Sequence, residues 1–326
     1  MRTKNTVVVI TGASSGIGRA TALAFAGKGA TVVLGARRGK ALQQVAEECQ
    51  ERGGRALAVP TEVTDEAAVE ELGRQAIKRF GSLDVWVNNA SVSVYGPFLE
   101  VPMEDFRRVL DVDVMGYVYG ARTALRQMRE QGRGVLVNVS SIASIAPMPY
   151  TTAYSMAKAA VTAMSASLRQ ELRLAGERKV KVCTVLPATV DTPFFQHAAN
   201  YTGRRVVAMP PVYPPAQVAD TILGLVRNPK DEVVVGGAAR AMRREARRHP
   251  QTAERAMARQ ADRAHLSRDE HAPAMSGSLH VTSSGLGEVE GGWGGRRRTA
   301  TRRVVAIAAA GAVTGAVVAA ANRASA

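Results

Sequence analysis

Short apolar runs rich in β-branched residues alternate with longer segments of helical periodicity over the first 236 residues, and no other feature constrains the fold as strongly. Several runs lack polar alternation, as expected for strands that helices cover on both faces. We therefore predict an α/β fold, a doubly wound parallel seven-stranded sheet in one domain, 1–236. The expected strands are Thr6–Thr11, Thr31–Ala36, Arg55–Pro60, Leu83–Asn88, Gly134–Ser140, Lys181–Leu186 and Glu232–Val235.

A glycine-rich turn follows the first expected strand and leads into a helix expected at Ala20–Gly27. Glycines allow a tight turn and let the backbone approach a pyrophosphate, which binds at the N-terminus of the helix. The strand before the turn and the helix after it are the context in which such a motif indicates a dinucleotide site. The residues expected to bind cofactor here are Gly12, Ser14, Ser15, Gly16, Ile17 and Gly18.

The end of the second strand indicates which nucleotide is preferred. NAD-selective enzymes usually carry an acid there for the ribose hydroxyls, but this chain has Ala36. Arg37 follows and can bond a 2′-phosphate, with Arg38 or Arg19 close enough to assist. The alternative is that Arg37 and Arg38 are surface charges near a helix end. The pattern favours NADP(H) over NAD(H).

Tyr154 and Lys158 are four residues apart in a segment of helical periodicity, so both side chains lie on one helix face. A nearby ammonium lowers the pKa of a tyrosine, which is about 10 when unperturbed. Ser141 ends the preceding strand, thirteen residues before Tyr154. A tyrosine and a lysine at this spacing occur by chance in many helices. With Ser141 and the glycine turn, they indicate an acid/base site.

These motifs together resemble the short-chain dehydrogenase/reductase (SDR) family over roughly residues 6–236. The resemblance implies a Rossmann fold and an NAD(P)-dependent oxidoreductase that interconverts CH–OH and C=O groups. It also implies that Tyr154 donates a proton to the carbonyl oxygen in reduction and removes it in oxidation. Ser141 would polarise the same oxygen, and Lys158 would hold the nicotinamide ribose hydroxyls.

The resemblance assigns further cofactor contacts. Glu62 and Val63 stand where the family has an Asp-Val pair that contacts adenine. Ser91 and Ala188 replace two family glycines beside these contacts. The other residues it implies are Asn89 and Ala90 along the cofactor, and Pro187, Val190 and Thr192 at the nicotinamide carboxamide.

Asp113 is a departure from the family pattern and our fourth catalytic candidate, with Ser141, Tyr154 and Lys158. Many members carry an asparagine at this position, whose main chain helps to hold a water in the proton relay. Two outcomes are open for the aspartate. Either Asp113 supports the same backbone bend, or it adds a charge near Lys158 and alters the proton path.

The expected substrate pocket is apolar. Side chains from loops at the carboxyl ends of the strands, and from a covering segment at 194–215, favour an apolar carbonyl or alcohol such as a lipid-like ketone, steroid or retinoid. The alternative is that most of them pack this segment against the domain. These side chains are Val92, Val94, Tyr95, Ile145, Met148, Tyr150, Phe195, Tyr201, Val207, Met209 and Tyr213.

The formal net charge is +15, and much of the excess lies in a C-terminal basic extension beyond residue 236. No helix-turn-helix, zinc-finger or RNA-recognition signature accompanies it, so we expect no specific nucleic-acid binding. We divide the extension into an Arg/Ala-rich helical part at 237–271, broken by Pro250, and a flexible Gly/Ser and basic linker at 272–303. An uncharged run at 304–321 follows as a candidate transmembrane helix. It is rich in alanine and glycine, so a surface helix or a frayed tail is the alternative.

The sequence is compatible with three hypotheses of function. The leading one is an NADPH-dependent oxidoreductase acting on a small apolar substrate, with a cytoplasmic catalytic domain tethered through the C-terminus. The second is a catalytically idle, membrane-anchored NADP(H)-binding scaffold or redox sensor, and the third is a basic membrane-surface or nucleic-acid adaptor. Cys49 and Cys183 form no metal-binding pattern, so we expect no metal. The resemblance also suggests homo-oligomers built through helices around 104–130 and 154–175.

Overall fold

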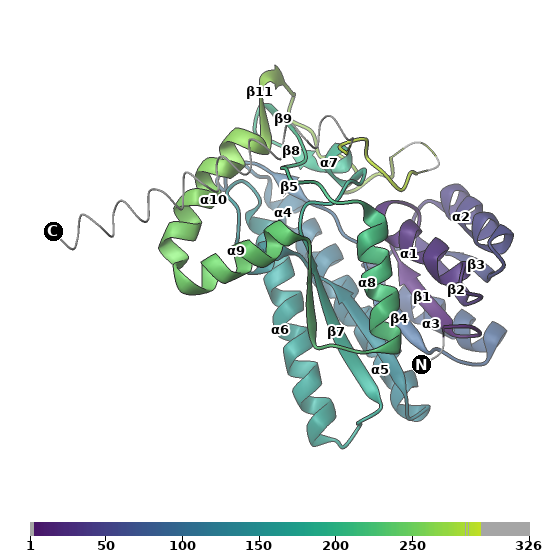
Figure 1. Cartoon of the computed structure of the whole chain (residues 1–326). Helices are drawn as coiled ribbons and strands as arrows, with labels where there is room; N and C mark the ends of the chain where they lie inside the picture. Colours follow the sequence, from purple (N-terminus) through teal and green to yellow (C-terminus); the bar gives the residue numbers. More distant parts are fainter. Residues whose placement is uncertain (1–2, 284, 286, 295–326) are drawn as a thin grey trace.

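The computed structural model describes residues 3–283, 285 and 287–294 (Figure 1). Seven parallel strands form one sheet in the order β10-β7-β6-β4-β1-β2-β3. This confirms the predicted doubly wound fold. The strands are β1 Val7–Thr11, β2 Thr31–Ala36, β3 Arg55–Pro60, β4 Val85–Asn88, β6 Gly134–Val139, β7 Val180–Pro187 and β10 Glu232–Val235.

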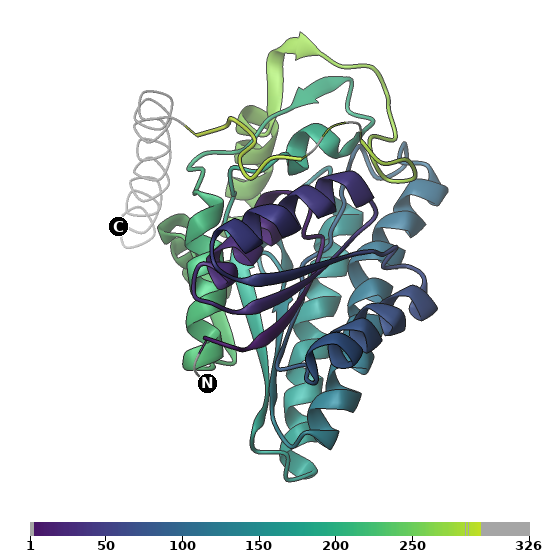
Figure 2. The same ribbon diagram turned by 90° about the vertical axis from the view of Figure 1, so that its right-hand side faces the viewer.

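Helices cover both faces of the sheet, as Figure 2 shows. Alternate residues of β1 point to opposite faces, because side chains alternate along a strand. Val8 and Ile10 pack in one apolar cluster with α1, α2 and α8, whereas Val7 and Val9 pack in another with α3, α5 and α6. These helices are α1 Gly16–Ala26, α2 Gly39–Glu51, α3 Glu66–Phe80, α5 Gly116–Glu130, α6 Thr152–Leu174 and α8 Pro215–Arg227.

The helical stretch that begins at residue 103 changes pitch in its middle. It runs as α4 Met103–Leu110, a π-helical turn η1 Asp111–Met115, and then α5. Single π-helical turns inside α-helices are frequent at functional sites. Here the turn carries Asp113, which is completely buried.

Smaller elements gather above the carboxyl edge of the sheet (Figure 1). Two small sheets form there, one from β5 and β8 and one from β9 and β11. No strand is predicted from the sequence in the β11 stretch. These elements are β5 Val94–Tyr95, η2 Ile142–Ser144, α7 Phe194–His197, β8 Ala199–Asn200, β9 Arg204–Val206, α9 Gly237–Arg248, α10 Pro250–Ala264 and β11 Leu266–His271.

The described part of the predicted linker lies against this edge of the domain. Leu279 is buried in an apolar cluster with Val94 and Phe106, and the Trp293 ring meets the Phe195 ring at 5.8 Å between centroids. The candidate transmembrane helix at 304–321 lies outside the described residues. None of the helices in the described part of the chain is long and apolar enough to cross a bilayer.

Candidate active site

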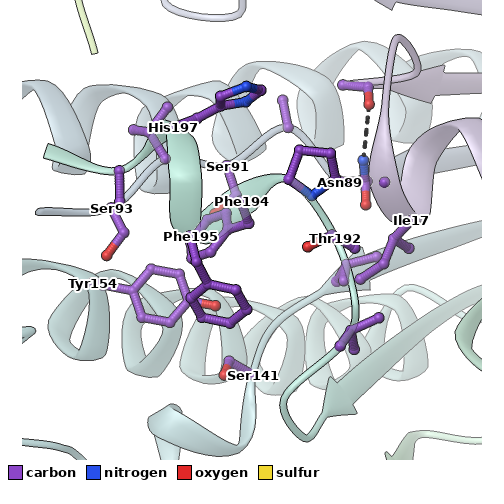
Figure 3. Close-up of a pocket in the computed structure, with 18 of the residues that line it drawn as sticks. Ile17, Asn89, Ser91, Ser93, Ser141, Tyr154, Thr192, Phe194, Phe195 and His197 are labelled. Carbon is purple, nitrogen blue, oxygen red and sulfur yellow. Dashed lines mark hydrogen bonds between the residues drawn. The ribbon is translucent and has the colours of Figure 1, made fainter. Parts of the chain in front are cut away.

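A cavity of about 280 Å³ opens at the carboxyl ends of the central strands. Open α/β sheets bind their ligands at this edge. The cavity brings most of the predicted site residues together (Figure 3). Its lining includes Gly12, Ser14, Ser15, Gly16, Ile17, Arg37, Arg38, Val63, Asn89, Ala90, Ser141, Tyr154, Lys158, Pro187, Val190 and Thr192.

The glycine turn is packed too closely to carry side chains. A Cβ on Gly12 would lie 2.7 Å from the Cα of Ala90, and one on Gly18 would lie 2.3 Å from the carbonyl oxygen of Gly12. The Asn89 amide donates to the carbonyls of Thr11, at 3.0 Å, and Gly12, at 3.3 Å. Gly18 itself does not line the cavity. The turn is thus held against the start of α1. First-turn N–H groups of a helix have no intrahelical partner and can bind phosphate, and here the Gly16 amide donates to the Glu288 carbonyl at 2.8 Å.

Arg37 and Arg38 flank the other wall of this end of the cavity. Arg37 donates to the carbonyls of Ser278, at 2.7 Å, and Leu279, at 3.1 Å. Arg38 donates to the hydroxyls of Ser14 and Ser283, both at 3.2 Å. Two guanidinium groups therefore stand where the sequence analysis expected a 2′-phosphate.

Arg19, the third arginine considered for that phosphate, is not in the cavity lining. Its guanidinium forms an ion pair with Glu48 and donates to the carbonyl of Gly287. Neither Glu48 nor Gly287 lines the cavity, so the Arg19 guanidinium is bonded outside it and not at the predicted phosphate site.

Glu62 does not line the cavity either, although Val63 does. Its carboxylate forms an ion pair with Arg108 at 2.6 Å and lies 3.9 Å from Arg37. Burial acts to raise the pKa of Glu62, but the hydrogen bonds from Arg108 and the Thr64 amide and the charges of both arginines outweigh it and lower that pKa. Glu62 is therefore a charge partner that fixes Arg37.

Ser141 and Tyr154 face the cavity from the end of β6 and the first turn of α6 (Figure 3). The Ser141 hydroxyl oxygen caps η2 by accepting from the Ala143 amide at 3.1 Å. That bond leaves the hydroxyl proton of Ser141 to be donated, and the hydroxyl also hydrogen-bonds Tyr154.

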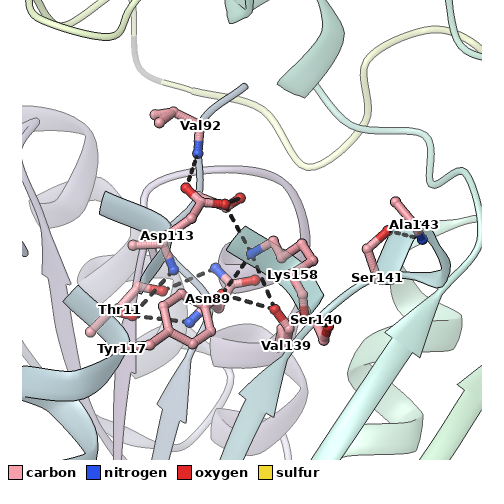
Figure 4. Close-up of polar contacts among 12 residues, drawn as sticks. Thr11, Asn89, Val92, Asp113, Tyr117, Val139, Ser140, Ser141, Ala143 and Lys158 are labelled. Atoms are coloured by element: carbon pink, nitrogen blue, oxygen red, sulfur yellow. Dashed lines mark hydrogen bonds and ion pairs between the residues drawn. The ribbon is translucent and has the colours of Figure 1, made fainter. Parts of the chain in front are cut away.

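Lys158 is fully buried, and its ammonium has three partners within the protein (Figure 4). The Nζ atom lies 3.0 Å from the Asp113 carboxylate, 3.2 Å from the Tyr117 hydroxyl and 3.4 Å from the Val139 carbonyl. It also lies 5.5 Å from the centroid of the Tyr154 ring. A positive charge is thus held beside the phenol.

Asp113 adds a charge beside Lys158, as one of the two alternatives above expected, because its carboxylate lies directly against the ammonium. One carboxylate oxygen also accepts from the Val92 amide at 2.8 Å, and the other accepts from the Ser91 hydroxyl. Ser91 is the residue that replaces a family glycine, so a chain with glycine at this position would lack this hydrogen bond. Three donors and no exposure to solvent make this a buried ion pair.

The pKa of Tyr154 reflects opposing influences. Burial raises the pKa of the phenol most strongly, the Lys158 charge and a hydrogen bond with Ser141 lower it, and the Asp113 charge raises it again. The net direction is upward. The phenol therefore holds its proton at neutral pH.

The sequence model of the short chain dehydrogenases matches residues 6–201. The chain belongs to the short-chain dehydrogenase/reductase family. Two relatives are each 38% identical to it over 241 residues. One is an uncharacterized oxidoreductase, YxnA, of Bacillus subtilis, with 73% of this chain and 67% of the relative covered. The other is a probable oxidoreductase, EphD, of Mycobacterium tuberculosis, with 69% of this chain but only 40% of the relative covered.

Solved SDR structures agree with this assignment. One from Burkholderia phymatum, in complex with NAD, superposes with a TM-score of 0.70 at 25% identity, covering 77% of this chain and 96% of that chain. An alcohol dehydrogenase of Thermococcus sibiricus, complexed with 5-hydroxy-NADP, gives 0.62 at 28% identity, with 71% and 96% covered. The chain is therefore an SDR dehydrogenase/reductase that uses a nicotinamide cofactor.

The apolar side chains predicted for the SDR substrate pocket divide into two groups. Some line the cavity, whereas others pack or bond elsewhere, as Tyr201 does by donating to Asp105 at 2.6 Å. Tyr213 likewise accepts from the Ala238 amide at 3.0 Å. In the lining are Val92, Tyr95, Met148, Phe195 and Met209, and outside it are Val94, Ile145, Tyr150, Tyr201, Val207 and Tyr213.

His265 is a lining residue that the sequence analysis missed. Burial lowers its pKa to about 4, so the imidazole is neutral. Its Nδ1 lies 2.5 Å from the Val207 carbonyl, which can only accept, so the proton is on Nδ1. Nε2 is then the acceptor for the Tyr95 hydroxyl at 3.3 Å. Nothing in the sequence around His265 signals this role, because the basic extension brings it back to the cavity only in three dimensions.

Proposed function

We propose that this SDR enzyme interconverts a carbonyl and a secondary alcohol on an apolar substrate, with NADP(H) as cofactor and Tyr154 as acid/base. The observation that carries the proposal is a single cavity with the glycine turn at one end and Ser141, Tyr154 and Lys158 at the other. The nicotinamide, when bound, supplies or takes up the hydride. The protein's own residues bind both reactants and move the proton.

In the reductive direction the Tyr154 phenol gives its proton to the carbonyl oxygen of the substrate. Its raised pKa keeps that proton available at neutral pH. The Ser141 hydroxyl, which hydrogen-bonds Tyr154 in this structure, donates to the same substrate oxygen and stabilises charge that develops there. Lys158 stabilises the resulting phenolate, and Asp113 holds the ammonium in place.

The proposed preference for NADP(H) rests on charge at the adenosine end. Ala36 offers no acceptor for a ribose hydroxyl, and the Arg37 and Arg38 guanidiniums both line the cavity. Guanidinium groups form strong charge-assisted bonds with phosphate. A 2′-phosphate is therefore the group that this wall is best suited to bind.

The proposal of an apolar substrate is based on the side chains nearest Tyr154. The Phe194 ring lies 5.6 Å from the Tyr154 ring and the same distance from the Phe195 ring. Met148 and Met209 line the same cavity and add to its apolar surface. Such a surface favours a hydrophobic ketone or alcohol over a charged one.

The decisive experiment is turnover of NADPH with a panel of hydrophobic ketones, followed by absorbance, with Tyr154→Phe alongside the wild type. We expect the variant to lose about 100-fold or more in kcat/KM while it still binds NADPH, because only the transferable proton is removed. An idle scaffold would bind NADPH equally in both proteins and turn over no ketone in either.

A further inference from the structure

A strap formed by residues 287–294 joins the two sides of the nucleotide cleft. It lies beyond residues 6–201, which carry the match to the family. At one end it reaches the N-terminus of α1, where the Gly16 amide donates to the Glu288 carbonyl at 2.8 Å. Arg19 donates to the Gly287 carbonyl beside it. The glycine turn is thus bonded directly to the strap.

At its other end the strap is fixed to the segment that follows β7. The Asp191 carboxylate accepts three main-chain amides, from Gly291 at 3.0 Å, Trp293 at 2.8 Å and Gly294 at 2.7 Å. Asp191 is only 6% exposed, and the proton transfer proposed above gives it no part. A buried carboxylate with three amide donors is a strong attachment point.

The glycines of the strap allow this close attachment. A Cβ on Gly291 would lie 2.2 Å from the Thr192 carbonyl oxygen, and one on Gly294 would lie 2.6 Å from an Asp191 carboxylate oxygen. Between them, the buried Trp293 indole donates to the Thr192 carbonyl at 3.1 Å and to the Gln196 side chain at 3.2 Å. The sequence Gly291-Gly292-Trp293-Gly294 therefore fits the surface of one particular loop.

We propose that Asp191 is a positioning residue that anchors the strap across the nucleotide cleft, so that nucleotide enters and leaves only when the strap is released. The glycine turn and Thr192, which the strap connects, both line the cavity. Gly16 and Thr192 are close neighbours, since a Cβ on Gly16 would lie 3.2 Å from the Thr192 Cβ. The attached strap links the two, so a nucleotide held against this part of the lining is retained until the strap is released. The inference rests on the proposed function for the identity of that nucleotide.

The test compares Asp191→Asn with the wild type in two measurements on the full chain. Hydrogen exchange followed by mass spectrometry reports on the strap amides without nucleotide, and stopped-flow displacement reports the dissociation rate of NADPH. We expect exchange in 287–294 and NADPH dissociation each to be about tenfold faster or more, since the variant loses one of two acceptor oxygens and the charge. The KM for NADPH should rise more than kcat falls.

Asp220→Asn makes the same chemical change at an exposed position on α8 and should alter neither rate. If Asp191→Asn fails to fold, Trp293→Phe serves as the second variant. It keeps an aromatic ring but removes the indole donor, and it should also increase both rates. Unchanged strap exchange, or faster exchange with unchanged NADPH dissociation, would overturn the proposal. If the folded wild type binds neither NADPH nor NADH, the proposed function fails instead, and the strap then has no nucleotide to enclose.

Discussion

Asp113 changes the charge balance around the reacting tyrosine. The charged and titratable groups that face Tyr154 are Lys158 on the same helix, Asp113 on η1, Tyr117 on α5, and Tyr95 on β5. Asp113 and Tyr117 act to raise the Tyr154 pKa, against the lowering by Lys158. The arrangement therefore favours the protonated phenol, the form that reduction requires.

Replacing Asp113 by asparagine tests this balance. The variant keeps the size of the side chain but removes the negative charge, so the Tyr154 pKa should fall. Alcohol oxidation needs the phenolate, and its rate rises as pH increases through that pKa. We expect the rising limb of kcat/KM for oxidation to move about one pH unit lower. An unchanged pH profile in a folded variant would show that Asp113 has no influence on proton transfer.

Arg37 is the residue on which cofactor preference should depend. We expect Arg37→Asp to weaken NADPH binding by about ten- to 100-fold, because a carboxylate there repels a 2′-phosphate, whereas NADH should bind no worse. Titration of nicotinamide fluorescence measures both affinities. Arg52→Asp, an equal change of charge at an exposed position after α2, is the control. Equal loss of NADPH and NADH affinity in Arg37→Asp would argue against a 2′-phosphate contact.

Among the secondary-structure elements, the start of α1 packs closely against the preceding turn because two glycines, one in each, leave room for the contact. Gly18 lies in α1, and any side chain there would meet the Gly12 carbonyl. Gly224 lies in α8, and a Cβ there would meet nothing within 4 Å. A side chain at Gly18 would therefore disturb packing, whereas a side chain at Gly224 would change only the helix propensity.

Alanine at these two positions should therefore have opposite effects. Gly224→Ala should raise the free energy of unfolding by up to about 1 kcal/mol, through helix propensity alone. Gly18→Ala should lower it by about 1–3 kcal/mol, because the main chain of the turn must move. Urea denaturation measures both changes. A stabilising Gly18→Ala would mean that the turn is not packed as described.

The sequence predicted local elements well, because their signals are local. Both β2 and β3 have the predicted bounds, and β4 begins two residues later than expected, at Val85. There the Asp84 carboxylate accepts the Val7 amide at 3.0 Å, a contact between distant parts of the chain. Asp84 resembles an ordinary strand-flanking residue in the sequence, so a pattern of apolar residues cannot reveal this role.

Across the whole molecule, short motifs in the sequence predict the parts of the cavity that they form, whereas contacts between segments far apart in the chain leave no such signal. The glycine turn, Ser141, Tyr154 and Lys158 meet in one cavity, as the motifs indicated. The contacts that place His265 in the same cavity, and those that attach the strap to Gly16 and Asp191, join segments that share no local pattern. A Gly- and Ser-rich stretch also looks like a linker until its glycines are seen to allow close packing.

Binding of nucleotide should stabilise the whole chain, because the cavity is formed by segments from all parts of the described sequence. A ligand that binds only the folded state adds about 2.7 kcal/mol at 100 times its Kd. We expect Tm to rise with increasing NADPH and to rise less with NADH at equal concentration. Scanning calorimetry of the wild type and of Tyr154→Phe should give the same NADPH-dependent rise, since the phenol is not needed for binding.

Most of the cavity lining comes from the part of the chain that matches the family, and a smaller part comes from beyond it. Ser141, Tyr154 and Lys158 belong to the part that the chain shares with its family, whereas Met242 and His265 come from beyond residues 6–201. Substitutions in the C-terminal extension can therefore reshape the pocket without touching the groups that move the proton. In evolutionary terms, such a protein can acquire a new substrate while it inherits its chemistry intact.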